Sequence, residues 1–134
     1  MSRSVKGVVR IGGFKKFQHF EQDIRRAFSS LSAYLGHREW SVDIILVGDQ
    51  AMKKNVLSFQ ADFSFPRPDI RGTYLGELYL NPDYITRHGE SLRHMLIHGF
   101  LHLLGYRHDT RRDRISMEKK EQELIVHLGS LLQD

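Results

Sequence analysis

Three histidines in the last third of the chain have a spacing that is typical of metal ligands. His98 and His102 are four positions apart, so on a helix their rings project from one face, about one turn apart. Gly105 follows the last leucine of that segment, where a left-handed residue lets a chain leave the helix axis. His108 comes three positions later and can return towards the pair. Three imidazoles around one ion leave a fourth position open, which is typical of catalytic rather than structural zinc.

The residue after the first histidine limits what such a metal could do. Metzincin proteases have the same histidine spacing, with a glycine in the same place, but carry a glutamate there as general base. Here the position is Gly99, which cannot move a proton, so a peptidase is disfavoured. Glycine inside a helix costs about 1 kcal/mol relative to alanine. Either a neighbouring element packs closely there, or open space is needed above the metal, or the glycine is simply tolerated.

Seven elements are expected to position these residues. Alternating and β-branched segments predict strands at 5–11, 40–47, 55–59 and 73–80. Apolar residues at helical spacing predict helices at 14–35, 90–104 and 111–128, and 63–72 is expected to be an exposed loop. This order indicates an α/β (α+β) fold, with a mixed four-stranded sheet and helices packed over it. Periodicity directs these residues into the core: Phe17, Phe20, Ile24, Phe28, Trp40, Ile44, Leu46, Leu57, Phe59, Leu101 and Leu124.

The amino-acid composition is typical of a globular protein. The 134 residues are 40% hydrophobic and 27% charged, and we expect one domain over 1–134. The longest apolar run is 44–47, far short of the ~20 residues of a spanning helix, so no membrane association is expected. No apolar segment suited to a signal peptide follows the N-terminus, which favours the cytoplasm. There is no cysteine, so any metal must be held by histidine or carboxylate side chains.

Basic residues outnumber acidic ones by 20 to 16, and several crowd the stretch after His108. Arg111 and Arg112 open the last helix and Arg107 precedes the third histidine. Such a cluster is typical either of a solvated helix face or of a surface that neutralises nucleic-acid phosphates.

Four segments together resemble one protein family. The stretch 98–108 resembles the H-G-x-L-H-L-x-G-y-D-H signature of the YbeY family of bacterial endoribonucleases and ribosomal RNA maturation factors. N-V-L-S-F at 55–59 is similar to its second motif, L-G-E at 75–77 to its L-G-D-I strand, and 117–129 to its C-terminal helix. The resemblance implies zinc, one ion per chain, on His98, His102 and His108. It also implies RNA as partner, in small-subunit ribosomal RNA processing and ribosome quality control.

The chain departs from this family pattern at three places. Members usually carry L-N-x-x-Y-R-G-x-D-x-x-T before the second motif, with an arginine proposed to act on RNA, whereas 48–54 contains neither tyrosine nor arginine. Lys53 and Lys54 offer charge there, but not the bidentate fork of arginine. Arg107 stands where most members have aspartate, and Glu77 also replaces an aspartate.

The function expected from these observations is a metal-dependent, single-strand endoribonuclease. Zinc on three neutral imidazoles keeps its full charge and lowers the pKa of a bound water to about 7. The alternative is a ribosome-assembly factor that binds RNA or protein and uses the zinc structurally. The catalytic residues, through the metal, are His98, His102 and His108. The candidate bases are the metal hydroxide itself, then Glu77, then Asp109, and His94 is a supporting or purely structural neighbour. The candidate RNA contacts are Arg107, Arg111, Arg112, Lys53 and Lys54.

Overall fold

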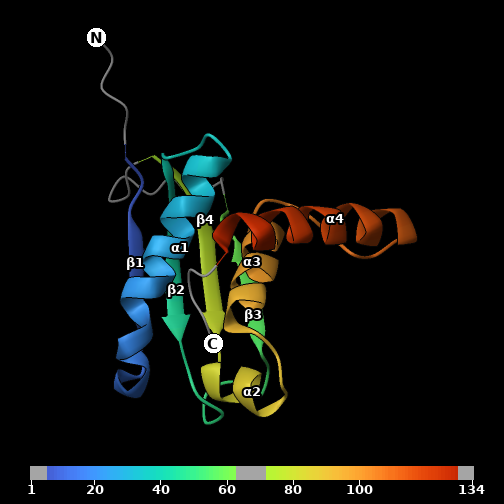
Figure 1. The fold of residues 1–134 in the computed structure, drawn as a ribbon. Helices are drawn as coiled ribbons and strands as arrows, with labels where there is room; N and C mark the ends of the chain where they lie inside the picture. Colours follow the sequence, from blue (N-terminus) through green and yellow to red (C-terminus); the bar gives the residue numbers. More distant parts are fainter. Residues whose placement is uncertain (1–5, 63–71, 130–134) are drawn as a thin grey trace.

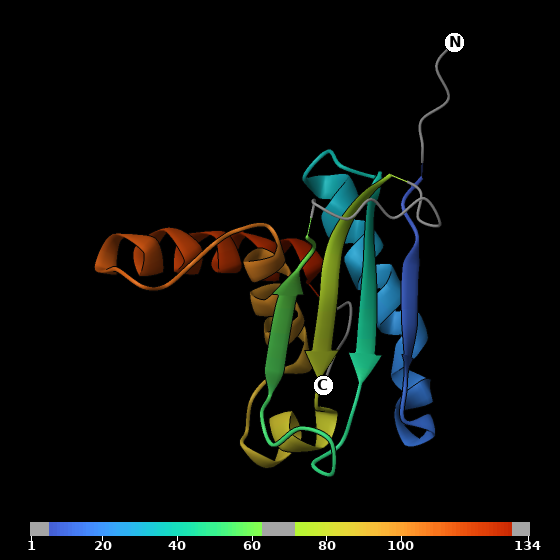
Figure 2. The same cartoon turned by 180° about the vertical axis from the view of Figure 1, so that it is seen from behind.

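The computed structural model describes residues 6–62 and 72–129, and the helices of this part lie on one face of a single sheet (Figures 1 and 2). The chain order is β1 (Val9–Gly13), a 3₁₀ helix η1 (Lys15–Phe20), α1 (Glu21–Tyr34), β2 (Trp40–Leu46), β3 (Val56–Gln60), β4 (Thr73–Leu80), α2 (Pro82–Arg87), α3 (Leu92–Leu103) and α4 (Arg111–Leu128). The loop predicted over 63–72 lies outside the described residues except for its last position.

The sheet is mixed and four-stranded, as predicted. Its strand order is β1-β2-β4-β3, in which β1, β2 and β4 are parallel and β3 runs antiparallel to β4. Parallel neighbours need a crossover connection, and α1 supplies it between β1 and β2. The two edges of the sheet are therefore β1 and β3.

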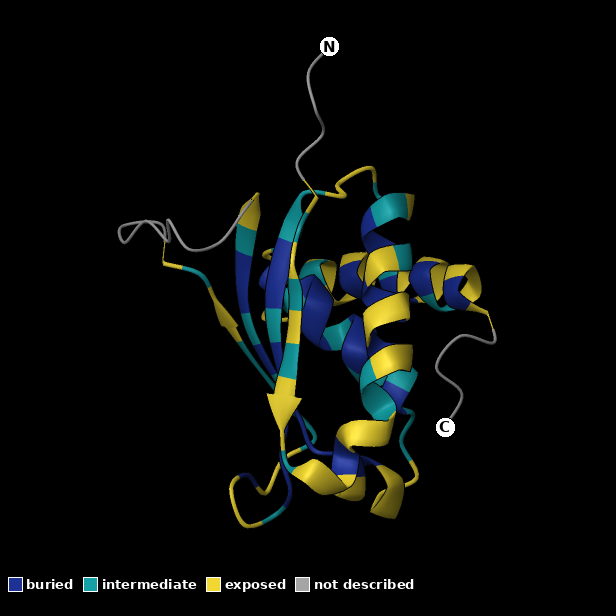
Figure 3. Cartoon of the chain, turned by 90° about the vertical axis from the view of Figure 1, so that its left-hand side faces the viewer, coloured by how far each residue is buried: buried dark blue, intermediate teal, exposed yellow. Residues whose placement is uncertain are grey.

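The core lies between the sheet and the helices, as the side view in Figure 3 shows. Seven predicted core residues are buried: Phe17, Ile24, Phe28, Ile44, Leu46, Leu101 and Leu124. Phe20 and Trp40 are partly buried against them. The prediction for Phe59 is wrong, because its side chain is 53% exposed. Side chains alternate along a strand, and Val56 and Ser58 face α3, so Phe59 and Leu57 point to the face without helices.

Several element boundaries differ from the sequence prediction. β1 runs through Gly12 and Gly13, because both pair with β2, whereas the predicted strand ended before them. The helix predicted at 14–35 begins as the 3₁₀ helix η1 and becomes α-helical only at Glu21. The short helix α2 was not predicted. Asn81 caps it by accepting a hydrogen bond from the Tyr84 amide, and Pro82 occupies its first position.

Within the described ranges, no helix has both the length and the apolar character that crossing a bilayer requires.

Candidate metal centre

Helix α3 and the segment after it bring three histidine rings together. His98 and His102 project from one face of α3, and their Nε2 atoms are 3.1 Å apart. Gly105 has a φ of +98°, the left-handed conformation expected just past the helix, and the chain then turns back. This brings the His108 ring centroid to 4.9 Å from that of His102 and 5.9 Å from that of His98. One ring nitrogen from each histidine lies within 4.8 Å of the others.

The hydrogen bonds of the first two rings determine which nitrogens are free. His102 Nδ1 lies 2.9 Å from the carbonyl oxygen of Tyr106, which can only accept, so Nδ1 carries the hydrogen. His98 Nδ1 lies 3.0 Å from Glu121 Oε1 and donates to that carboxylate in the same way. In the neutral rings both Nε2 atoms then present lone pairs.

Two lone pairs that face each other at 3.1 Å repel each other unless a proton or a metal ion lies between them. Tetrahedral zinc with Zn–N distances of about 2.0–2.1 Å holds its ligand nitrogens about 3.3–3.4 Å apart. The pair formed by His98 and His102 already has nearly this spacing, and a ring nitrogen of His108 lies within 4.8 Å of both. The residues present therefore fit a metal ion with imidazole ligands.

The environment of His102 keeps its ring neutral. Burial lowers the pKa of His102, because the half-buried site disfavours the charged imidazolium, and the neighbouring His98 and His108 act in the same direction. The hydrogen bond to Tyr106 opposes this shift without reversing it. A neutral imidazole is the form that binds metal ions.

Glu121 of α4 connects two histidines of α3. Its carboxylate accepts from His98 Nδ1 through Oε1, and its Oε2 lies 2.5 Å from His94 Nε2. The Glu121 side chain is only 9% exposed. His94, expected as either a supporting or a structural neighbour, thus reaches the site only through Glu121. Analysis of the sequence did not identify Glu121, although a signal was present, since it shares the buried face of α4 with Met117, Leu124 and Leu128.

Gly99 is explained by close packing rather than by open space above the metal. A Cβ atom at this position would lie 2.2 Å from Leu78 Cδ1 of β4 and 2.9 Å from Val56 Cγ2 of β3. Position 99 therefore faces the sheet, on which α3 rests directly. The absence of a side chain lets α3 approach the edge strand β3, whose Ser58 hydroxyl donates to the Gly99 carbonyl at 3.0 Å.

Replacing Gly99 by alanine should destabilise the fold despite the better helix propensity of alanine. Overpacking typically costs about 1–3 kcal/mol, and the propensity gain offsets about 1 kcal/mol. Leu78 is fully buried, so its methyl group would have to shift within the core. We expect Gly99→Ala to lower the free energy of unfolding by up to about 2 kcal/mol and Tm by several degrees in thermal denaturation. Gly12→Ala is the control, because open space surrounds that position. An unchanged Tm for Gly99→Ala would contradict this packing.

A cleft of about 460 Å³ opens beside the three histidines. Its walls are the edge strand β3, from Asn55 to Gln60, and the chain from Gly105 to His108 that follows α3. Arg107 lines this cleft, and it is exposed, paired with Asp109 at 3.1 Å. The predicted arginine next to the third histidine is thus placed beside the site.

The structure does not bring the other predicted residues to the cleft. Glu77 alternates with Leu78, which faces α3, so its side chain lies on the opposite face of the sheet, where it accepts from the Tyr79 hydroxyl. Arg111 and Arg112 belong to the first turn of α4, which extends away from the sheet (Figure 1). Lys53 and Lys54 are exposed in the loop after β2 and do not line the cleft.

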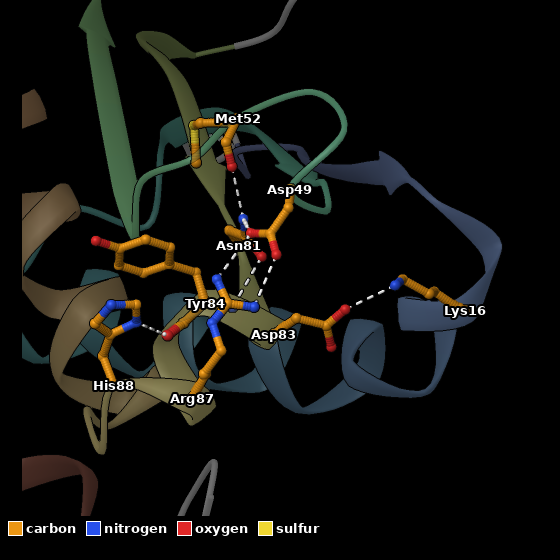
Figure 4. Close-up of polar contacts among 8 residues, drawn as sticks. All are labelled: Lys16, Asp49, Met52, Asn81, Asp83, Tyr84, Arg87 and His88. Atoms are coloured by element: carbon orange, nitrogen blue, oxygen red, sulfur yellow. Dashed lines mark hydrogen bonds and ion pairs between the residues drawn. The ribbon is translucent and has the colours of Figure 1, made fainter.

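That shortened loop is fixed at the far end of β4, as Figure 4 shows. Asn81 is fully buried and donates to Asp49 Oδ1 at 3.0 Å and to the Met52 carbonyl at 2.7 Å. Arg87 donates to Asp49 Oδ2 at 2.8 Å, and this guanidinium, with Asn81, holds the pKa of Asp49 below its usual range. The loop is therefore held by its own carboxylate, and its lysines point to solvent.

Comparisons with known proteins agree with the motifs. A family model described as Endoribonuclease YbeY matches residues 13–129. An Endoribonuclease YbeY from Syntrophus aciditrophicus is 30% identical over 139 residues, which cover 85% of this chain and 84% of that protein. The one from Anaplasma marginale is 40% identical over 85 residues, or 56% of this chain and 51% of that protein. The solution structure of TM1509 from Thermotoga maritima has a similar fold, with a TM-score of 0.55 at 20% identity, over 92% of this chain and 93% of that one.

Proposed function

Because the chain belongs to the Endoribonuclease YbeY family, we propose that it is a zinc-dependent endoribonuclease acting on single-stranded RNA in ribosomal RNA maturation. The proposal includes one zinc ion per chain, held by His98, His102 and His108, and a single domain over 1–134. It also includes the small ribosomal subunit as the source of the substrate.

The main support for the proposal is the position of two ring nitrogens. The Nε2 atoms of His98 and His102 lie 3.1 Å apart beside a cleft that His108 also lines. When bound there, zinc lowers the pKa of a water to about 7 and polarises a phosphoryl oxygen, which is the chemistry of phosphodiester hydrolysis. Three imidazole ligands leave a coordination position open for this chemistry.

The chain's own residues have distinct tasks in this scheme. Glu121 and the Tyr106 carbonyl hold the first two rings by their Nδ1 atoms, so that both Nε2 atoms point to one place. Arg107 lies on the cleft wall, where its guanidinium can neutralise a phosphate of the RNA backbone. Arg111 and Arg112 follow Arg107 in the sequence and lie in the first turn of α4, so they would contact phosphates beyond the cleft.

A peptidase finds no support in the site. The glutamate that serves as base in metzincins would have to occupy position 99, which faces the sheet and where even a Cβ atom would lie 2.2 Å from Leu78 Cδ1. The rival proposal of an assembly factor with a structural zinc differs from ours in one respect: it needs the metal for the fold rather than for turnover.

The test is cleavage of a single-stranded ribosomal RNA fragment by protein that has been stripped with a chelator and then reloaded. We expect no cleavage by the stripped protein and recovery with about one equivalent of zinc, while circular dichroism stays the same throughout. A base-paired RNA of the same sequence is the control substrate and should remain intact. Binding of RNA without cleavage in any metal state would support the assembly factor, and loss of the fold on stripping would identify the zinc as structural.

A further inference from the structure

A second cavity lies at the opposite edge of the sheet from the histidines. It has a volume of about 230 Å³ and lies, open to solvent, between the chain that leads into β1, one face of α1 and the turn before β2. None of its lining residues belongs to the histidine cleft. Since β1 and β3 are the two edges of a four-stranded sheet, three strand spacings, or about 14 Å, separate the two sites.

Three basic side chains, Lys6, Arg25 and Arg38, line this cavity, and no acidic residue of 6–62 or 72–129 does. The Arg25 guanidinium donates one hydrogen bond to the Val9 carbonyl. Lys6 and Arg38 have no ion pair or side-chain hydrogen bond in the described part of the chain. They are held near each other, because the Gly7 amide donates to the Arg38 carbonyl at 2.8 Å. Three exposed cations around one open hollow favour an anion.

Ser32 adds an independent sign that a ligand belongs here. Ser32 lines the cavity and is 4% exposed, yet its hydroxyl has no hydrogen-bond partner among the described residues. Buried polar groups are nearly always paired, so this hydroxyl lacks the partner that such groups ordinarily have. Ser29 and Arg25 lie one and two turns earlier on the same face of α1, so two hydroxyls and a guanidinium form a row.

The remaining wall is aromatic. Phe28 and Trp40 line the cavity beside the polar row. Trp40 is held by a stacked contact with His37, at 4.4 Å between centroids, and by an edge contact with Phe100. A volume of about 230 Å³ equals roughly eight water molecules, so it holds more than one phosphate group and leaves room for an attached sugar or ring.

We propose that this cavity binds the phosphate monoester of a nucleotide. A monoester carries about −1.5 to −2 charges at pH 7, which matches a pocket with three cations, and its sugar or base would lie against Trp40. The source is either a free mononucleotide or the phosphorylated end of an RNA strand. Only the second source rests on the proposed function, since the pocket shares no residue with the histidine cleft.

Trp40 is the only tryptophan of the chain, so its fluorescence reports on this cavity directly. Adenosine 5′-monophosphate should change this signal in a saturable way, whereas adenosine and inorganic phosphate should bind at least about tenfold more weakly, since each lacks one half of the ligand. A 5′-phosphorylated pentanucleotide, compared with its 5′-hydroxyl form, separates the two sources. Binding of the mononucleotide alone indicates a free nucleotide, and binding of the phosphorylated strand indicates an RNA end.

Two variants test the assigned contacts. The double variant with Lys6→Ala and Arg38→Ala should bind adenosine 5′-monophosphate at least about tenfold more weakly than the wild type, because charge-assisted hydrogen bonds are lost. Ser32→Ala should weaken it by about three- to tenfold and leave Tm unchanged or raised, because the free protein loses only an unpaired hydroxyl. Arg26→Ala, an exposed cation of the same helix outside the cavity, is the matched control.

The histidine site serves as a second control. His102→Ala should bind the nucleotide as the wild type does, so that failure of the cavity and failure of the endoribonuclease remain distinguishable. The proposal is overturned if neither the mononucleotide nor the phosphorylated strand changes Trp40 fluorescence. It is also overturned if Arg26→Ala weakens binding as much as the double variant, or if inorganic phosphate binds as tightly as the mononucleotide.

Discussion

His102→Ala is expected to abolish both zinc binding and RNA cleavage while leaving the fold intact. Removal of an outer hydrogen-bond partner of a metal ligand typically costs 10–100-fold in metal affinity or activity, so loss of a direct ligand should cost at least about 100-fold in each. The ring of His102 is the central one, within 4.6 Å of the His98 ring centroid and 4.9 Å of that of His108. Elemental analysis of the purified proteins and a cleavage assay on single-stranded ribosomal RNA measure the two effects.

The control for His102→Ala is His88→Ala. His88 is an exposed histidine that hydrogen-bonds to the Tyr84 carbonyl of α2, away from the cluster (Figure 4). It should retain one equivalent of zinc and full cleavage. If His102→Ala contained as much zinc as the wild type, the assignment of the metal to the three histidines would be wrong. Wild-type cleavage by His102→Ala, with its zinc lost, would show that the metal is not part of the reaction.

His108→Ala separates catalytic from structural zinc. His108 is exposed and lies in the segment after α3, so its ring is not part of the hydrophobic core. The variant should lose cleavage while its circular dichroism and Tm in the presence of a chelator match those of the wild type. Unfolding of His108→Ala under conditions in which the wild type is folded would instead favour the structural role.

The elements that were predicted most accurately have strong local signals. β4 and α4 were predicted with their observed limits, 73–80 and 111–128. Thr110 caps α4 by accepting from the Asp113 amide, and Gly129 follows its last residue. Such caps set helix limits through neighbouring residues alone. The histidine spacing is equally local, because a helix turn determines the positions of His98 and His102.

What the sequence did not reveal depends on tertiary packing. Phe59 looks like a core residue, but its side of the sheet has no helices in the described structure. Glu77 looks like a candidate base, but strand alternation directs it away from α3. Gly99 left three explanations open until the position of Leu78 was known. Each of these depends on which face of β3 or β4 is covered by helices, and periodicity cannot distinguish the two faces of a strand.

Glu121 illustrates the same limit at the site itself. It lies 23 positions after His98, on another helix. Its local signals are that a carboxylate shares the buried face of α4 with Met117, Leu124 and Leu128, and that it falls within the segment 117–129 that resembles the family's C-terminal helix. A buried carboxylate is unfavourable unless it is hydrogen-bonded, and Glu121 is satisfied by two histidines of α3.

This arrangement leads to the second large expected effect, on metal affinity. A carboxylate that accepts from the Nδ1 of a ligand histidine orients the ring and makes Nε2 a stronger donor to the metal. Glu121→Gln keeps the size and an accepting oxygen but removes the charge, so we expect zinc affinity to fall by about 10-fold. Glu121→Ala removes both and should lower it by about 100-fold. Competition with a chromogenic zinc chelator measures both values.

Glu118→Gln is the matched control for Glu121, because it changes an exposed glutamate of the same helix by the same chemistry. It should leave zinc affinity unchanged. A positioning role for Glu121 also requires that zinc affinity falls from the wild type to Glu121→Gln to Glu121→Ala at a temperature well below the Tm of all three proteins, where all three are folded. If Glu121→Ala lowers Tm but binds zinc as tightly as the wild type, Glu121 joins α4 to α3 and has no part in holding the metal. If both variants bind zinc normally and fold normally, the geometry of His98 is set by α3 alone.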